Sequence, residues 1–218
     1  MGTWVYLNEK TDSIKYLCQK DKHLAKLISM IGPITYQTHD DGFSFLVHEI
    51  IEQMLSIKAG QKIFNRLANL CDGGITPDRI LSLTVDQLRA VGTSSSKANC
   101  ILNLSKSVVT GELILSNLTE LSDKEVISSL IDLKGIGNWT AKMYLIFVLD
   151  RPDILPYEDG AFIQSYKWLY KTTDASPTTI KKKCKKWSPY SSVAARYLYR
   201  ALDMGFTKSE FHLYKEDA

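Results

Sequence analysis

The segment of residues 140–149, TAKMYLIFVL, carries almost only apolar side chains and constrains the fold more than any other part of the chain. A helix that is apolar on every side has to be surrounded by protein. The segment is too short to cross a membrane, because a span needs about 18 apolar residues or more. It therefore predicts a buried helix, around which other helices have to pack.

Start and stop signals of helices recur along the rest of the chain. Thr84 and Gln87 form a predicted capping box ahead of a short helix that Gly92 closes, and Ser122 and Glu125 form a second one. No segment shows a convincing strand pattern. The sequence thus predicts an all-α fold, with further helices over residues 12–31, 43–57, 59–71, 97–109, 162–170, 177–186 and 191–204.

The charge of the chain is unevenly distributed, although its net value is only +3. Residues 160–202 contain nine Lys and Arg side chains and one acid, Asp174, which favours an anionic partner such as nucleic acid. The alternative for the run KKKCKK, residues 181–186, is an ordinary solvated helix face. The four cysteines are scattered, which argues against a metal or iron–sulfur site and for free thiols in a reducing compartment. With no signal peptide or membrane span in the sequence, we expect a cytoplasmic protein.

Two glycines, Gly135 and Gly137, separate the second capped helix from the apolar one. They do not form a dinucleotide-binding turn, which needs a third glycine and a preceding strand, and the P-loop pattern is missing as well. A glycine turn that opens a helix binds phosphate through main-chain N–H groups. A plain helix–helix turn with glycine as C-cap is the other interpretation.

Four stretches together resemble the helix-hairpin-helix DNA glycosylases with a Gly/Pro-rich loop and a catalytic aspartate. They are LKGIGNWTAKMYLIFVLDRPDILPYEDGAF, VHEIIEQMLSIKAGQKIFNRL, LRAVGTSSSKANCI and WSPYSSVAARYLYRAL, which lie within residues 43–202. Within this group the chain resembles the bacterial 3-methyladenine DNA glycosylase II branch. The resemblance implies one glycosylase unit of two helical lobes, with the active site between them and without an N-terminal β-domain. The expected central lobe covers about residues 34–150 with the hairpin at 123–149, and residues 1–33 and 151–218 form the second lobe.

The resemblance places the catalytic carboxylate on Asp159, with helix capping as its alternative role and Glu158 as a rival carboxylate. A carboxylate near C1′ stabilises the oxocarbenium-like sugar while the base departs. The resemblance also implies that Gln53 and Met54 fill the gap left by a base flipped out of the duplex. For Met54, packing in the core is the alternative.

The expected base pocket consists of Trp139, Met143, Tyr199 and Gly160, although a core position is the alternative for Tyr199. Trp139 stands where members that also cut the strand carry a lysine, which forms a Schiff base with the sugar. Tryptophan cannot do so, but it can stack on a cationic base. We therefore expect a monofunctional enzyme.

The hairpin is expected to hold a DNA phosphate through Gly135, Gly137, Thr140 and Lys142. The resemblance also implies a structural Na⁺ or K⁺ on the backbone carbonyls of Ile131, Leu133 and Ile136, with no required cofactor and no iron–sulfur cluster. Three positions depart from the usual family residues. They are Glu52 in place of glycine, Ser191 in place of arginine, and the small Gly160.

The function expected from the resemblance is excision of alkylated purines such as 3-methyladenine and 7-methylguanine, by base flipping and hydrolysis of the N-glycosidic bond. The expected partner is double-stranded DNA with alkylated bases, bound by a monomer in a bacterial cytoplasm, at the nucleoid while it acts, and not a membrane. Two alternatives stay open. One is a non-catalytic binder of damaged or abasic DNA, and the other is a glycosylase for hypoxanthine, uracil or adenine.

Overall fold

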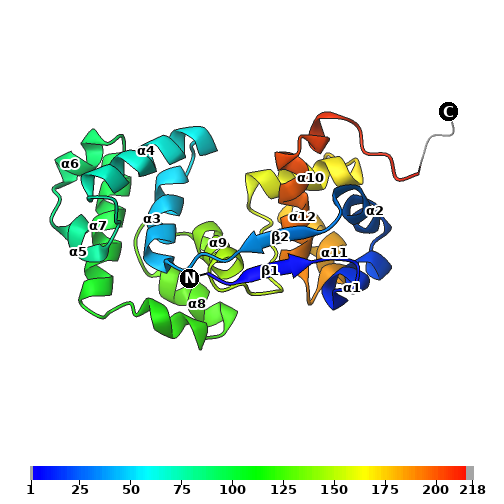
Figure 1. The fold of residues 1–218 in the computed structure, drawn as a ribbon, viewed down its shortest axis with the longest axis horizontal. Coiled ribbons are helices and arrows are strands. Elements are labelled where there is room, and N and C mark those ends of the chain that lie inside the picture. The colour runs from blue at the N-terminus through cyan, green and yellow to red at the C-terminus, as the bar shows by residue number, and fades with distance from the viewer. Residues whose placement is uncertain (1, 215–218) are drawn as a thin grey trace. The chain divides into compact units, whose positions relative to one another are not determined.

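The computed structural model describes residues 2–214, which divide into two compact units (Figure 1). The central unit covers residues 39–149, and the terminal unit combines residues 2–38 with residues 150–214. The central unit contains α3 (Gly42–Glu52), α4 (Ile57–Leu70), α5 (Pro77–Leu81), α6 (Val85–Ala90), α7 (Ser95–Val109), the 3₁₀ helix η1 (Leu115–Thr119), α8 (Asp123–Ile131) and α9 (Asn138–Phe147). The terminal unit contains β1 (Trp4–Leu7), α1 (Asp12–Lys20), α2 (Lys22–Ile31), β2 (Ile34–Gln37), α10 (Gly160–Tyr170), α11 (Pro177–Cys184), η2 (Lys185–Trp187), α12 (Ser191–Asp203) and η3 (Phe206–Lys208).

Helix α9 forms the centre of the first unit, as its apolar sequence predicts. Every residue of it from Thr140 to Ile146 is buried, and α3 and α8 pack against it. Both predicted capping boxes are present, with reciprocal hydrogen bonds at Thr84 and at Ser122. These local signals fix where α6 and α8 begin, so the hairpin formed by α8 and α9 follows directly from the sequence.

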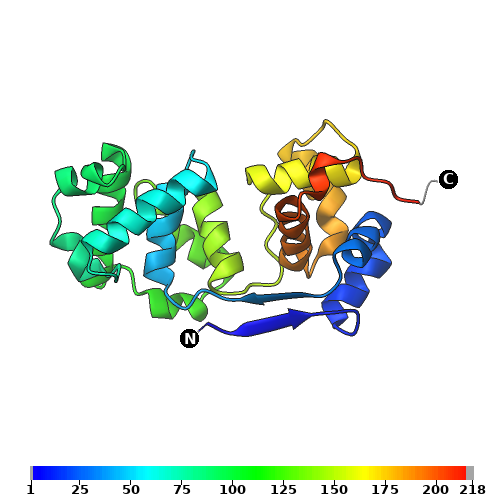
Figure 2. The ribbon, with the colours of Figure 1, turned by 45° about the horizontal axis from the view of Figure 1, so that its top comes forward.

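The terminal unit contains a two-stranded antiparallel ribbon that the sequence analysis did not predict (Figure 2). β1 and β2 pair with Trp4 opposite Gln37 and Leu7 opposite Ile34. Each strand has only four residues, and one face of the ribbon is exposed to solvent. The alternation of buried and exposed side chains is therefore too short to recognise in the sequence. The fold remains all-α in class. Because β2 pairs with β1, the chain enters the central unit after Thr38, not near residue 34.

Two predicted helices end earlier than expected. Residues 12–31 form α1 and α2, because the Asp21 side chain caps α2 by accepting hydrogen bonds from the N–H groups of His23 and Leu24. Residues 43–57 do not form one helix either, since α3 ends at Glu52 and a turn follows. Among the described helices, none combines the length and apolar character that a membrane span requires.

Buried side chains hold the terminal unit together around α10 and α12. Phe162, Tyr166 and Trp187 are buried there, with Leu17 of α1 and Leu24 of α2. Asp21 is a buried acid within this unit, with 1% of its surface exposed. Its carboxylate accepts hydrogen bonds from the Tyr170 hydroxyl and from Trp187 Nε1, the latter at 2.9 Å.

Candidate active site and DNA interface

The turn of the hairpin brings α8 to an end at Ile131 and starts α9 after Gly137. The Ile136 N–H donates to the Leu133 carbonyl oxygen at 3.0 Å, and the Ile136 side chain is buried beneath the turn. Gly137 is the N-cap of α9 and has no side chain to cap it, so the positive end of the helix dipole faces outward at this turn. Such a helix start suits an anion.

The two glycines of the turn differ in whether the fold itself requires a residue without a side chain. Gly135 has a φ of +103°, and a Cβ at this position would lie 2.6 Å from the Cys100 sulfur. Gly137 has ordinary extended torsions, and a Cβ there would have no neighbour within 4 Å. Gly135 is therefore required by the fold. Gly137 is not, which fits a surface that another molecule approaches closely.

The turn after α3 lies against the hairpin. The Gln53 side-chain amide donates to the Gly135 carbonyl oxygen at 3.1 Å and to Thr140 Oγ1 at 3.3 Å. Thr140 is buried, so its hydroxyl serves to hold Gln53 and is not displayed to a phosphate as we predicted. Gln53 accordingly ties two segments of the central unit together.

Met54 projects from this turn into solvent. Its side chain is fully exposed, at 101%, and its φ of 59° lies in the left-handed region. The alternative of core packing for Met54 is therefore wrong. Leu55 and Ile57 follow it and are also exposed, by 42% and 75%. An apolar tip of this kind is suited to insertion between bases.

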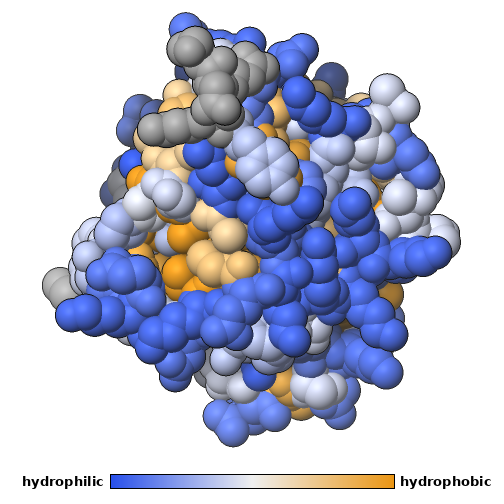
Figure 3. Space-filling view, turned by 90° about the vertical axis from the view of Figure 1, so that its right-hand side faces the viewer, coloured by the Kyte–Doolittle hydropathy of each residue, from blue (hydrophilic) through white to orange (hydrophobic). Residues whose placement is uncertain are grey.

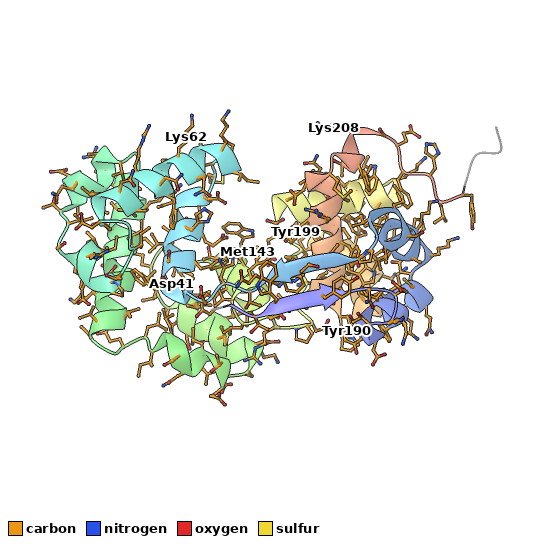
Figure 4. All side chains as sticks on the ribbon, in the orientation of Figure 1. Asp41, Lys62, Met143, Tyr190, Tyr199 and Lys208 are labelled. Carbon is orange, nitrogen blue, oxygen red and sulfur yellow. The ribbon has the colours of Figure 1, made fainter. Side chains whose placement is uncertain are left out.

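The other predicted residues of the central unit lie on α9. Trp139 is half-buried in its first turn, while Met143 is buried one turn further on (Figure 4). Lys142, which we expect to help hold a DNA phosphate, is also buried, with 8% exposure. Among the predicted site residues on α9, Trp139 is therefore the one with accessible aromatic surface.

Asp159 belongs to the terminal unit and is the N-cap of α10. Its Oδ1 accepts a hydrogen bond of 2.7 Å from the Phe162 N–H, so the capping interpretation is correct. Capping leaves a catalytic role possible, because a carboxylate has two oxygens. Asp159 is 8% exposed, whereas Glu158 is exposed. The two candidate carboxylates thus differ sharply in environment.

Gly160 and Tyr199 complete the predicted residues of the terminal unit. Gly160 is exposed and has open space where a Cβ would stand. Tyr199 lies on α12, half-buried against the core of the unit (Figure 4). Ser191, at the start of α12, donates to Asp153 Oδ1 at 2.6 Å. Ser191, which stands where the family usually has arginine, therefore has a hydrogen-bond partner in Asp153.

Glu52 lies in a cluster with His48 and Glu49 on α3. His48 Nδ1 is 3.7 Å from Glu49 Oε1, and His48 Nε2 is 3.6 Å from Glu52 Oε1. Hydrogen bonding to Glu49 raises the pKa of His48, and burial raises that of Glu52. The three side chains could ligate a metal, with their ligand atoms within 4.8 Å of one another. Since both imidazole nitrogens already face carboxylates, ion pairing accounts for the arrangement.

The lysine run of residues 181–186 has mixed surroundings. Lys186 forms an ion pair with the buried Asp21 at 3.0 Å, and Lys181 lies 4.1 Å from the centre of the Tyr157 ring. Lys182 and Lys185 are exposed. The surface of the terminal unit is mostly hydrophilic on the face in Figure 3, apart from a small apolar area. Part of the run therefore stabilises the fold, and part is available to an anionic partner.

Lys97 is a residue of this site that the sequence did not reveal. It lies in the first turn of α7, and its Nζ donates to the carbonyl oxygens of Ile51 and Gln53 at 2.8 and 2.6 Å. In the sequence it appears only as a lysine near a helix start. No local pattern marks a cation whose partners are main-chain oxygens more than 40 residues away.

A Gly-x-Gly hairpin linked to an exposed apolar tip, followed by a buried carboxylate at a helix start, defines a helix-hairpin-helix protein of the DNA glycosylase type. The family model of the HhH-GPD superfamily of base excision DNA repair proteins matches residues 47–189, and the chain belongs to this superfamily.

Similar proteins share most of the chain. DNA-3-methyladenine glycosylase 1 of Schizosaccharomyces pombe is 30% identical over 184 residues, which cover 82% of this chain and 80% of that protein. The crystal structure of a DNA-3-methyladenine glycosidase from Bacillus halodurans is 31% identical, with a TM-score of 0.83 and coverage of 96% and 97%. The S. pombe 3-methyladenine DNA glycosylase in complex with abasic DNA is 25% identical, with a TM-score of 0.81 and coverage of 94% and 100%.

Proposed function

We propose that this protein is a DNA glycosylase of base excision repair that releases alkylated purines, such as 3-methyladenine and 7-methylguanine, from double-stranded DNA. The observation that carries the proposal is Asp159, a buried carboxylate at the start of α10, which lies within the segment that matches the superfamily. The printed names of the similar proteins support alkylated bases as the substrate class. The proposed enzyme is a monomer of the 3-methyladenine DNA glycosylase II type.

An alkylated purine can leave the sugar without protonation by a general acid. An N3- or N7-alkylated purine is cationic, so the electron pair of the C1′–N bond neutralises the base as it departs. The sugar becomes oxocarbenium-like, and a nearby carboxylate stabilises that charge. Water then adds to C1′ and loses its proton to the carboxylate or to solvent, which leaves an abasic site. Asp159 is the proposed carboxylate.

Trp139 supports a monofunctional reaction within this proposal. A lyase step needs an amine that forms a Schiff base with C1′, and the indole at position 139 provides none. A half-buried indole can instead stack on a cationic purine, with a cation–π contribution of about 0.5–2 kcal/mol. Recognition by charge and stacking would accept several alkylated purines.

The hairpin is proposed to bind DNA backbone through the start of α9. Gly137 leaves room for a phosphate, and the helix dipole attracts it. A structural Na⁺ or K⁺ on the carbonyls of Ile131, Leu133 and Ile136 belongs to the same proposal. The Leu133 carbonyl already accepts one hydrogen bond, from Ile136, and its second lone pair suits a cation.

Base release from methylated duplex DNA by the wild type and by Asp159→Asn tests the proposal. Asparagine is as good an N-cap as aspartate, so the variant should fold with nearly unchanged stability. We expect base release to fall at least about 100-fold, as for loss of other groups that stabilise transition-state charge. Abasic-site affinity should persist, and Glu158→Gln should keep activity.

Three results would point elsewhere. A wild type that binds abasic DNA but releases no base from any substrate would favour the non-catalytic binder. Release of hypoxanthine, uracil or adenine alone, identified by mass, would change the substrate class. Efficient trapping of a covalent protein–DNA adduct by sodium borohydride would contradict the monofunctional reaction.

A further inference from the structure

The ammonium group of Lys97 binds the turn that carries Met54. Lys97 Nζ donates to the carbonyl oxygens of both Ile51 and Gln53, which lie on either side of the last residue of α3. The final carbonyls of a helix lack partners within the helix, and a cation there also faces the negative end of the dipole. Lys97 therefore fixes the direction in which the chain leaves α3.

This contact has a cost that a surface lysine does not have. Lys97 is half-buried, and burial lowers its pKa. These two hydrogen bonds of the ammonium group end on neutral main-chain oxygens. A half-buried cation that has neutral acceptors gains less stability than one paired with a carboxylate would. Its geometry suits a role in positioning.

Met54 depends on its backbone for its position. Its side chain is fully exposed, so packing does not hold it, and its φ of 59° is a conformation that costs about 1–3 kcal/mol for a residue with a side chain. Such a conformation persists only where its surroundings impose it. The main-chain hydrogen bond from the Leu55 N–H to the Glu52 carbonyl closes the turn, and Lys97 anchors the residues on either side of Glu52.

The same helix also supports the hairpin. Cys100, one turn after Lys97 on α7, is the residue against which Gly135 packs. Gln53 in turn donates to the Gly135 carbonyl. The first two turns of α7 thus set the Met54 turn through Lys97 and the hairpin turn through Cys100.

We propose that Lys97 is a positioning residue, which holds the Met54 turn in the conformation that enters DNA when the target base is flipped. The inference rests on the proposed function, because it assumes that Met54 contacts DNA. Lys97 acts through Met54 and touches neither the substrate base nor the sugar. Removing its charge should leave the fold in place and allow the turn to relax.

The test is a double-mutant cycle of Lys97→Met and Met54→Ala, measured as affinity for an abasic-site duplex and as base release from methylated duplex. Methionine keeps the length of the side chain and removes its donors. The matched control is Lys106→Met, on the same helix but exposed. Thermal midpoints of all variants report folding. If Lys97→Met fails to fold, Lys97→Arg, which keeps the donors but changes their geometry, enters the same cycle.

We expect Lys97→Met to weaken abasic-site binding and base release by about 10-fold or more, and to have little further effect when Met54 is already alanine. Lys106→Met should have no effect. Equal losses from Lys97→Met with and without Met54 would mean a purely structural role and would overturn the inference, as would full activity of Lys97→Met. A wild type that releases no base would overturn the proposed function instead, and the cycle in abasic-site affinity would still decide the role of Lys97.

Discussion

Gly135 lies directly against Cys100. A Cβ at position 135 would be 2.6 Å from the Cys100 sulfur and 2.9 Å from its Cβ, and the φ of +103° also disfavours any residue with a side chain. Gly137, two residues further on, has neither constraint. This short motif thus contains two different glycines. Packing within the described chain requires Gly135, whereas the space beside Gly137 is open to a binding partner.

Gly135→Ala should destabilise the protein by about 2–4 kcal/mol, since it combines a left-handed backbone with an overpacked contact. Urea unfolding of the purified variant measures the loss. Adding Cys100→Ala should restore part of it, because the sulfur is removed while the backbone conformation remains. An unchanged unfolding midpoint for the single variant would contradict the packing argument.

Gly137→Val should weaken DNA binding while it changes the stability of the fold little. Its extended torsions tolerate a side chain, so stability should fall by about 1 kcal/mol or less, as for a poor residue at an N-cap. Affinity for an abasic-site duplex should fall by about 10-fold or more, because the side chain keeps phosphate away from the start of α9. Fluorescence anisotropy at two salt concentrations measures this, and unchanged affinity would show that the hairpin does not hold phosphate.

The parts of the fold that the sequence predicts are those set by local signals. The capping boxes at Thr84 and Ser122 fix helix starts within a few residues, and the apolar run of α9 has only one stable environment. The break between α1 and α2 at Asp21 could not be predicted from such local signals. The sequence continues a helical pattern through it, and tertiary bonds to Tyr170 and Trp187 hold the carboxylate there.

The candidate site shows the same division. The family pattern points to Asp159, Trp139 and the glycines, because motifs record residue identity. It does not give burial, so it does not show that Thr140 and Lys142, which we expect to help hold a DNA phosphate, are buried. Lys97 and Cys100 escaped notice since their partners lie in distant segments.

Glu52, one of the three departures from the family pattern, lies against Gly60 of α4. A Cβ on Gly60 would lie 2.5 Å from Glu52 Cγ, so the acid at position 52 requires glycine within α4. Gly60→Ala should therefore destabilise the wild type. In a Glu52→Gly background the same change should stabilise by about 0.5–1 kcal/mol, the usual gain of alanine over glycine inside a helix. Thermal unfolding of the four proteins measures the reversal, and equal effects in both backgrounds would exclude the coupling.

Asp21 should dominate the acid sensitivity of the terminal unit. Burial alone would raise its pKa, but hydrogen bonds from Tyr170 and Trp187 and the charge of Lys186 outweigh burial and lower it. A carboxyl whose pKa is lower in the folded state stabilises the fold above its unfolded pKa, about 3.9, and loses this contribution as the pH falls through the folded value. Asp21→Asn should therefore cost about 1–3 kcal/mol near neutral pH, because the buried Trp187 N–H loses its carboxylate acceptor, while solvent screens the lost charge partner of the half-exposed Lys186.

The difference between the wild type and Asp21→Asn should shrink as the pH falls from about 4 towards the lower pKa of folded Asp21, because the unfolded wild type takes up a proton in this range and the folded protein does not. Urea midpoints of both proteins between pH 7 and pH 3 measure this trend. The exposed pair of Lys171 and Glu210, at 3.1 Å, offers a matched control in the same unit. Its Glu210→Gln variant should stay within about 1 kcal/mol of the wild type at every pH. A difference for Asp21→Asn that is small at neutral pH, or that grows on acidification, would contradict the role assigned to this carboxylate.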